Sequence, residues 1–410
     1  MGSVHNLSSR EEILFVSHDA SRSGAPFVLL HFLKWFKENA DTPFRILLRN
    51  GGQLEDEFAG LAPTAVFHRA QSTRDGVAGR VLRRVGLDHL ATQRSNNRLK
   101  AEVDQSKVSM IYSNTITNGE VLELFKDFKG PVLSHVHELE FGIRFRMDPR
   151  RIKQTFEHSC HYIAGANAAK RNLVENHAIP PEKIDVVYEC IPIDLHAISM
   201  ASASYASVRG ELNIPEDAFI VGGAGTTEWR KGPDIFIQVA RTIAGRELSR
   251  SVHFVWVGGD HQGRRYEQLR HDVRHAGLDG RVHFVGARPD YLRFLAAFDV
   301  LALVSREDCF PLVMLEAALF SHPTVCFDGV GGASEFVEND CGSVVPFLDL
   351  ESMGERILAL FESPDLRSAL GQRAAAKVRE RHDVSIVGPQ IVTILDRVLR
   401  ANSALRKAPG

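Results

Sequence analysis

The segment VLALVSREDCFPLVMLE, residues 300–316, joins an apolar run to an apolar helical pattern. Residues 300–304 are short, apolar and partly β-branched, which predicts a buried strand. Pro311 opens the helical pattern, and proline is favoured at the start of a helix because its missing amide hydrogen leaves no unpaired donor. The segment therefore predicts a strand, a turn and a helix, which is the repeating step of a parallel α/β sheet.

The same alternation extends in both directions from this segment. The predicted strands are residues 13–17, 45–48, 108–113, 132–136, 162–164, 184–188, 219–222, 252–257, 282–285, 300–304, 324–327 and 343–345. Pro26 is expected at the first position of the first helix, and the small, polar stretch 199–207 is expected to connect two domains. We therefore predict an α/β protein with two doubly wound parallel-sheet domains, residues 1–195 and 208–385, followed by a helix over 386–410.

Length and charge exclude several classes of protein. The 410 residues are 44% hydrophobic and have a formal net charge of −2, which argues against a nucleic-acid binder with a basic surface. No apolar run approaches the roughly 18 residues that span a bilayer, and the polar start lacks the apolar stretch of a secretory signal. Five scattered cysteines without a C-x-x-C pair indicate neither disulfides nor a zinc site. We expect a cytoplasmic protein.

The turn and helix after residue 304 form the strongest candidate site. In parallel sheets, ligands bind beyond the carboxyl ends of the strands, and the free amides of Leu312 and Val313 at a helix start attract phosphate. Glu316 shares its helix face with leucines, and a carboxylate there needs a partner. A ligand diol is one such partner, and an internal salt bridge is the structural alternative.

A glycine-rich segment, GGAGTTEWRKG at residues 222–232, follows the first strand of the second domain. Its glycines allow close backbone approach, and Arg230 with Lys231 would neutralise a diphosphate. The alternative is a flexible loop with a solvated basic pair. The segment is neither a P-loop nor a complete dinucleotide fingerprint, which disfavours an NAD-dependent dehydrogenase.

Two segments of the first domain are further candidates. Strand alternation places His135 and His137 on one face, with His137 nearer the ligand edge, where imidazole can bind a sugar hydroxyl. For His135 a core position is the better interpretation. In the loop 17–26, Gly24 would approach a phosphate, unless the loop only caps the first helix through Ser23.

Basic residues recur over the stretch 69–100, with few acidic residues opposing them and an apolar stripe between them. Such a helix can lie on an anionic membrane face, although a solvated surface helix is the more frequent case. The residues at 144–153 extend the basic patch.

With these residues the chain resembles the retaining glycosyltransferases of GT-B fold, family 4, also described as glycosyl transferases group 1. The resemblance covers nearly the whole chain, and its most specific element is the family's E-x7-E motif. Here the spacing selects Asp308 and Glu316, with Phe310 and Pro311 in the family's places, so this chain has Asp where Glu is usual. The family's G-R-x-K-G segment matches at Lys231, with Arg230 as the nearest arginine.

The resemblance implies the roles of these residues. Glu316 would hold the nucleotide ribose, Asp308 would position the donor sugar, His137 would contact the transferred sugar, and Gly24 would lie near the phosphates. It also implies a nucleoside diphosphate sugar as donor, no metal cofactor, and a last helix that crosses back to the first domain. Bacterial enzymes of this type commonly build surface polysaccharides, such as lipopolysaccharide, on saccharide or lipid-linked saccharide acceptors at the membrane.

Two alternatives remain open at this point. One keeps the fold and changes the reaction, to a sugar-nucleotide epimerase or an inverting transferase. The other is a non-catalytic subunit that binds a sugar nucleotide, which the Asp at position 308 and the missing upstream arginine favour.

Overall fold

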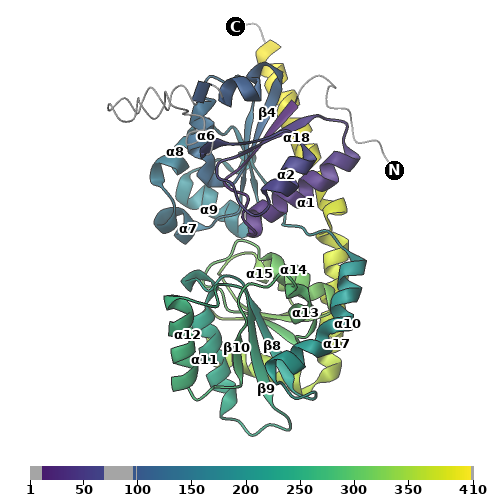
Figure 1. Cartoon of the computed structure of the whole chain (residues 1–410). Coiled ribbons are helices and arrows are strands. Elements are labelled where there is room, and N and C mark those ends of the chain that lie inside the picture. Colours follow the sequence, from purple (N-terminus) through teal and green to yellow (C-terminus); the bar gives the residue numbers. More distant parts are fainter. Residues whose placement is uncertain (1–11, 69–95, 98, 408–410) are drawn as a thin grey trace. The chain divides into compact units, whose positions relative to one another are not determined.

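The computed structural model describes residues 12–68, 96–97 and 99–407. The chain divides into two compact units, residues 1–189 with 384–410 and residues 190–383. Each unit is a parallel sheet covered by helices (Figure 1). The basic residues of the stretch 69–100, apart from Lys100, lie outside the described residues, so the amphipathic helix predicted there stays a prediction.

The first unit contains a sheet of seven parallel strands in the order β3-β2-β1-β4-β5-β6-β7. The strands are β1 (Glu12–Ser17), β2 (Phe44–Leu48), β3 (Thr64–Val66), β4 (Val108–Asn114), β5 (Val132–Val136), β6 (His161–Ala164) and β7 (Ile184–Val186). The helices are α1 (Gly24–Asn39), α2 (Glu55–Leu61), α6 (Gly119–Leu124), α7 (Glu140–Arg146), α8 (Pro149–His158), α9 (Asn167–His177) and α18 (Val384–Lys407), with short turns η1 (Gln105–Lys107), η2 (Ile116–Asn118) and η3 (Pro181–Lys183).

The second unit contains a sheet of six parallel strands in the order β10-β9-β8-β11-β12-β13. The strands are β8 (Phe219–Ala224), β9 (Val252–Val257), β10 (Val282–Phe284), β11 (Val300–Leu303), β12 (Thr324–Phe327) and β13 (Gly342–Val345). The helices are α10 (Leu195–Leu212), α11 (Pro233–Ala244), α12 (Arg264–His275), α13 (Tyr291–Ala296), α14 (Leu312–Leu319), α15 (Ala333–Val337), α16 (Leu350–Glu362) and α17 (Pro364–Arg381), with the turn η4 (Trp229–Lys231).

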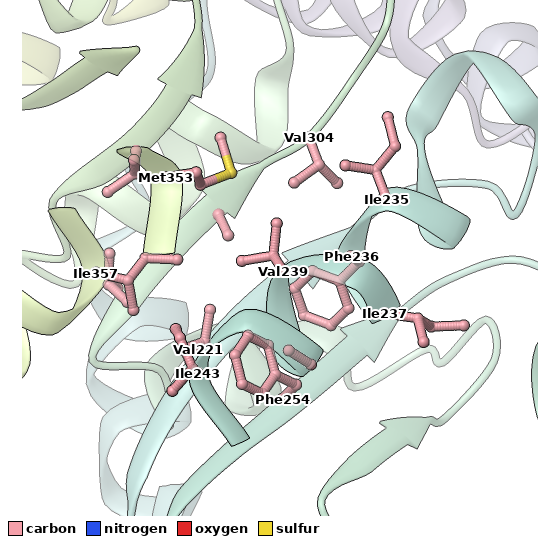
Figure 2. Close-up of a cluster of buried hydrophobic side chains, with 14 of the residues drawn as sticks. Val221, Ile235, Phe236, Ile237, Val239, Ile243, Phe254, Val304, Met353 and Ile357 are labelled. Atoms are coloured by element: carbon pink, nitrogen blue, oxygen red, sulfur yellow. The ribbon is translucent and has the colours of Figure 1, made fainter. Parts of the chain in front are cut away.

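Figure 2 shows how helices α11 and α16 pack on the second sheet. Phe236 and Val239 of α11 meet Phe254 of β9, and Met353 and Ile357 reach in from α16. All five side chains are almost fully buried. Burial of apolar surface, at about 25 cal/mol per Å², therefore stabilises the packing of these helices on the sheet that carries the site.

The doubly wound α/β architecture predicted from the sequence is confirmed, and two local predictions are wrong. Residues 199–207 are part of helix α10 instead of a connecting loop, because the Asp194 carboxylate caps that helix by accepting from the amide of Ala197 at 3.0 Å. Helix α1 begins at Gly24 instead of Pro26.

The last helix, α18, packs on the first helix, α1. Gly388 of α18 lies against the ring of Trp35, where an added methyl group would approach a ring carbon to 2.4 Å. Arg397 of α18 forms an ion pair with Asp185 of the same unit. Among the described residues, no helix combines the length and apolar character needed to cross a membrane.

Candidate active site

The candidate site in the second unit lies where strands β8 and β11 end. Lys231, in the turn after β8, and Asp308, in the loop after β11, form an ion pair between Nζ and Oδ2. A guanidinium nitrogen of Arg230 lies 3.3 Å from Oδ1 of Asp308 and donates to the carbonyl of Glu307 at 2.7 Å. The structure thus brings together the basic pair and the first acid of the motif.

This cluster carries two cations against one carboxylate in a buried setting. Burial lowers the pKa of Lys231, and Arg230 lowers it further, while Asp308 opposes the shift. Burial would raise the pKa of Asp308, but the two cations reverse this effect and lower it. The direct contacts thus set two basic side chains against one carboxylate, an arrangement that suits an anion.

The glycine-rich loop serves packing more than expected. Gly222 and Gly223 lie within β8, where added methyl groups would meet the rings of Phe298 and Trp256. Gly232 has a φ of 74°, and a methyl group there would approach the carbonyl oxygen of Val304 to 2.2 Å. Two of these glycines therefore admit core rings, and Gly232 lets the turn carrying Lys231 pass close to β11.

Helix α14 begins at Leu312, with Pro311 as its capping residue and no side-chain cap. Leu312 and Val313 are half-buried, and their amides belong to the first turn, which has no acceptor within the helix. Phe310 is buried and stacks on His382, with ring centroids 5.2 Å apart. Phe310 therefore serves the packing of the second unit. The backbone amides at the start of α14 are the groups of this segment that can bind an anion.

Glu316 finds a partner that the sequence did not indicate. The hydroxyl of Tyr291, at the start of α13, donates to Oε1 of Glu316 at 2.7 Å. Burial raises the pKa of Glu316, and the hydrogen bond from Tyr291 partly offsets that rise. No ion pair to Glu316 is formed by the described residues, so its carboxylate keeps acceptor capacity for a diol.

A glycine-rich loop after β12 also belongs to this region and was missed. The amide of Asp308 donates to the carbonyl of Val330 at 2.8 Å, and the amide of Gly332 donates to the carbonyl of Cys309 at 2.7 Å. These bonds hold the segment before α14 in an extended conformation. Three glycines within residues 329–332, directly after a strand, are the sequence signal for such a loop.

The candidate site in the first unit is centred on His137, just after β5. Its Nδ1 lies 2.5 Å from Oε1 of Glu189, and its Nε2 lies 2.8 Å from Oδ1 of Asn114. The His137 and Glu189 side chains are 8% and 4% exposed. Both partners were missed by the sequence analysis: Asn114 ends the neighbouring strand β4, and Glu189 follows 52 residues later.

His135 lies beside His137, with ring centroids 4.0 Å apart. Its Nδ1 is 2.6 Å from the hydroxyl of Tyr112. Burial, and next the charge of His137, lower the pKa of His135 well below its ordinary value. His135 is therefore a neutral core residue, as the preferred interpretation of the sequence has it.

One oxygen of Glu189 and one ring nitrogen from each of the two histidines lie within 4.8 Å of one another. Such atoms can hold a metal ion, but each ring nitrogen of His137 already faces an oxygen. A cation bound by Glu189 would compete with that arrangement. The described residues therefore form a hydrogen-bonded ion pair here instead of an open set of ligands.

Gly24, the third sequence candidate of the first unit, is the first residue of α1 and is exposed. An added methyl group would meet nothing within 4 Å. Ser23 precedes the helix, but its side chain makes no capping hydrogen bond. The chain's own packing therefore does not require a glycine at position 24.

Comparison with known proteins agrees with the architecture. Over 94% of the chain, the structure superposes on 99% of Anabaena HepE, crystallised in complex with UDP and glucose, with a TM-score of 0.73 at 21% identity. A glycosyltransferase from Rickettsia africae aligns over 96% of this chain and 99% of that chain, with a TM-score of 0.71 at 15% identity. The fold is that of GT-B glycosyltransferases.

Residues 205–377 match the family described as "Glycosyl transferases group 1". A D-inositol 3-phosphate glycosyltransferase of Corynebacterium kroppenstedtii is 25% identical over 292 residues, which are 67% of this chain and 64% of that protein. The D-inositol 3-phosphate glycosyltransferase of Kineococcus radiotolerans is 28% identical over 242 residues, which are 55% of this chain and 55% of that protein. The chain thus spans less than two thirds of the first relative's length.

Proposed function

We propose that this protein transfers a sugar from a nucleoside diphosphate sugar to a saccharide or lipid-linked saccharide, with retention of the anomeric configuration, in the synthesis of a bacterial surface polysaccharide. The observation that carries the proposal is the Lys231–Asp308–Arg230 cluster, with its surplus positive charge beside the start of α14. HepE, which shares the fold, was crystallised with UDP and with UDP-glucose, which supports a donor of this class.

Cleavage of the sugar–diphosphate bond develops negative charge on the leaving diphosphate. Lys231, Arg230 and the first amides of α14 are the groups that would stabilise it, in a setting where burial strengthens their effect. Glu316 would accept hydrogen bonds from the two ribose hydroxyls while Tyr291 holds its other oxygen. Retention is carried over from the family resemblance.

The first test is binding, because a ligand of the folded state raises its melting temperature. We expect one nucleoside diphosphate to raise the melting temperature of the purified protein more than its monophosphate does. A panel of the corresponding nucleotide sugars then identifies the donor. If no nucleoside diphosphate shifts the transition, the proposed donor site is wrong.

The second test is product analysis with that donor and a panel of acceptors. The panel includes lipid-linked saccharides and D-inositol 3-phosphate, because two relatives are named D-inositol 3-phosphate glycosyltransferases. NMR of the product reports the anomeric configuration. Inversion would mean an inverting transferase, a free epimerised sugar nucleotide would mean an epimerase, and binding without turnover would mean a non-catalytic subunit.

We further propose that transfer needs no divalent metal ion, because the two cations at Asp308 supply the positive charge that a metal would bring to the diphosphate. Addition of EDTA should leave the initial rate unchanged. A loss of rate that Mg²⁺ or Mn²⁺ restores would contradict this proposal.

We also propose that the protein works at the inner face of the cytoplasmic membrane. In the described part of the first unit, Phe145 of α7 is 71% exposed among exposed arginines. The neighbouring residues Ile143 and Arg144 line an open groove together with apolar and charged side chains of α8 and with His177. This mixture suits an anionic lipid surface. Flotation with anionic vesicles should fall for Phe145→Ser and stay unchanged for Phe347→Ser, a matched exposed phenylalanine of the second unit. Flotation equal to that with neutral vesicles would contradict this location.

A further inference from the structure

Both ring nitrogens of His137 face oxygens that accept hydrogen bonds. The identity of the Asn114 atom is settled by its other contact, because the Asn114 amide nitrogen donates to the carbonyl of Ala25 at 2.8 Å. Turning the amide over would set two acceptors, the Asn114 oxygen and the Ala25 carbonyl, against each other. The oxygen of Asn114 therefore points to Nε2 of His137, 2.8 Å away.

Hydrogen-bond chemistry then fixes the proton count of the ring. Asn114 Oδ1 can only accept, so Nε2 donates, and the Glu189 carboxylate accepts from Nδ1 at 2.5 Å. A neutral imidazole has one donor, whereas imidazolium has two. The two acceptors, which come from two other segments of the unit, therefore suit an imidazolium ring.

The remaining charged groups around the ring act in both directions. Burial alone would lower the pKa of His137, but Glu189, and to a smaller extent Glu138, raise it above its ordinary value. Two further histidines interact with the ring. Burial and the charge of His137 lower the pKa of His135. Burial lowers the pKa of His18, although the charge of Asp19 opposes that shift. Arg49, which also lowers the pKa of His18, is the nearby permanent cation.

We propose that Glu189 and Asn114 are positioning residues that keep His137 as an imidazolium of fixed orientation, and that sugar transfer uses this cation instead of a neutral imidazole base. The inference rests on the proposed function and on the role that the family resemblance implies for His137, a contact with the transferred sugar. In this state the ring takes no proton from the acceptor hydroxyl. It places a positive charge at the site, while its two N–H groups stay bonded to Glu189 and Asn114.

The charge state is tested without any enzymatic activity. In the full chain labelled with ¹⁵N-histidine, the His137 signal, assigned by its loss in His137→Gln, should show two protonated nitrogens at pH 7. In Glu189→Gln the titration midpoint of His137 should fall by about one to three pH units, because an opposite charge is lost while burial remains. A neutral ring in the wild type, or an unchanged midpoint in the variant, overturns the proposal.

Two further variants guard this test. Glu189→Asp keeps the carboxylate, so its His137 titration midpoint should stay above that of Glu189→Gln. This second variant keeps the test valid if Glu189→Gln fails to fold. Glu123→Gln is the matched control, since Glu123 pairs with His158 at 3.0 Å in the same unit. It should leave the His137 midpoint where it is, and a fall equal to that of Glu189→Gln would overturn the specific role of Glu189.

The activity arm concerns the reaction itself. Since the imidazolium is lost as pH rises through its pKa, kcat should fall on the alkaline side, and Glu189→Gln should move this limb to lower pH with little change in donor KM. A limb that stays in place while the NMR midpoint moves overturns the role in transfer. If the wild type transfers no sugar at all, the proposed function fails, and the NMR result still decides the charge state.

Discussion

The two units each gather buried charges where their parallel strands end, and the balance of charge differs between them. In the second unit, Lys231 and Arg230 share one carboxylate, Asp308, so one positive charge is left over. In the first unit, His137 has one carboxylate and one amide, so each ring nitrogen has its own acceptor. The surplus charge of the second unit suits a bound anion. In the first unit, the two acceptors instead hold the ring of His137, with its protons, in one orientation.

Lys231→Met tests the surplus most directly and has the largest expected effect. Removing one of the two cations that face the developing negative charge should lower transfer by about 10²- to 10³-fold. Arg230 remains as a partner of Asp308, so the variant should still fold. Initial rates at saturating donor measure the effect, with Arg246→Ala, an exposed cation of the same unit, as the control. Near-normal turnover of Lys231→Met would mean that Lys231 does not stabilise the leaving diphosphate.

Glu316→Gln comes second. A half-buried carboxylate that accepts hydrogen bonds from a ribose is worth about 1.5–3 kcal/mol, which corresponds to roughly a tenfold to hundredfold rise in donor KM. Tyr291→Phe removes only the hydroxyl that holds Glu316 and should raise donor KM less. If Tyr291→Phe had the larger effect, the tyrosine and not the acid would bind the donor.

Asp308→Asn sharpens the comparison because two quantities should move in opposite directions. Breaking a buried ion pair lowers the melting temperature of the ligand-free protein. The two released cations should nevertheless bind a nucleoside diphosphate several-fold more tightly, since the competing carboxylate is gone. Calorimetric titration measures the dissociation constant, and Asp308→Glu is the charge-preserving control. Weaker binding in Asp308→Asn would mean that Asp308 itself contacts the donor through hydrogen bonds.

Gly24→Ala has the smallest expected effect on the protein itself. Alanine fits the open space at the start of α1, so stability should stay equal or rise by less than about 1 kcal/mol. Any loss of donor affinity would then report a phosphate close to this backbone. Gly232→Ala is the contrasting variant, because its φ of 74° and the carbonyl of Val304 leave no room. Equal melting temperatures for both variants would contradict this local structure.

The same contrast explains what the sequence could predict. The second-unit candidates could be proposed from the sequence because Asp308 and Glu316 belong to one local motif and Lys231 to another, each within the segment that follows an apolar strand. In the first unit the sequence indicated His137 as a candidate but not Glu189, since only the folded sheet brings a residue 52 positions away to its ring. Sequence spacing predicts local chemistry well and long-range partners poorly.

The prediction of secondary structure from the sequence had similar limits. Strands with continuous apolar runs were predicted within one or two residues, whereas β3, with only three half-buried residues, gives too weak a signal. Helix α10 was mistaken for a connection because serine and alanine resemble a linker, and its Asp194 cap went unrecognised. The glycines of β8 were interpreted as a ligand loop, although Gly222 and Gly223 make room for core rings.

Helix α18 has a consequence for the order in which the protein is made. The second unit is one continuous piece, residues 190–383, and can fold as soon as it leaves the ribosome. The first unit must wait, because buried residues of α18, such as Ile391 and Leu395, belong to it. The segment synthesised first is thus completed last, and a premature stop after residue 383 would damage the amino-terminal unit while sparing the other.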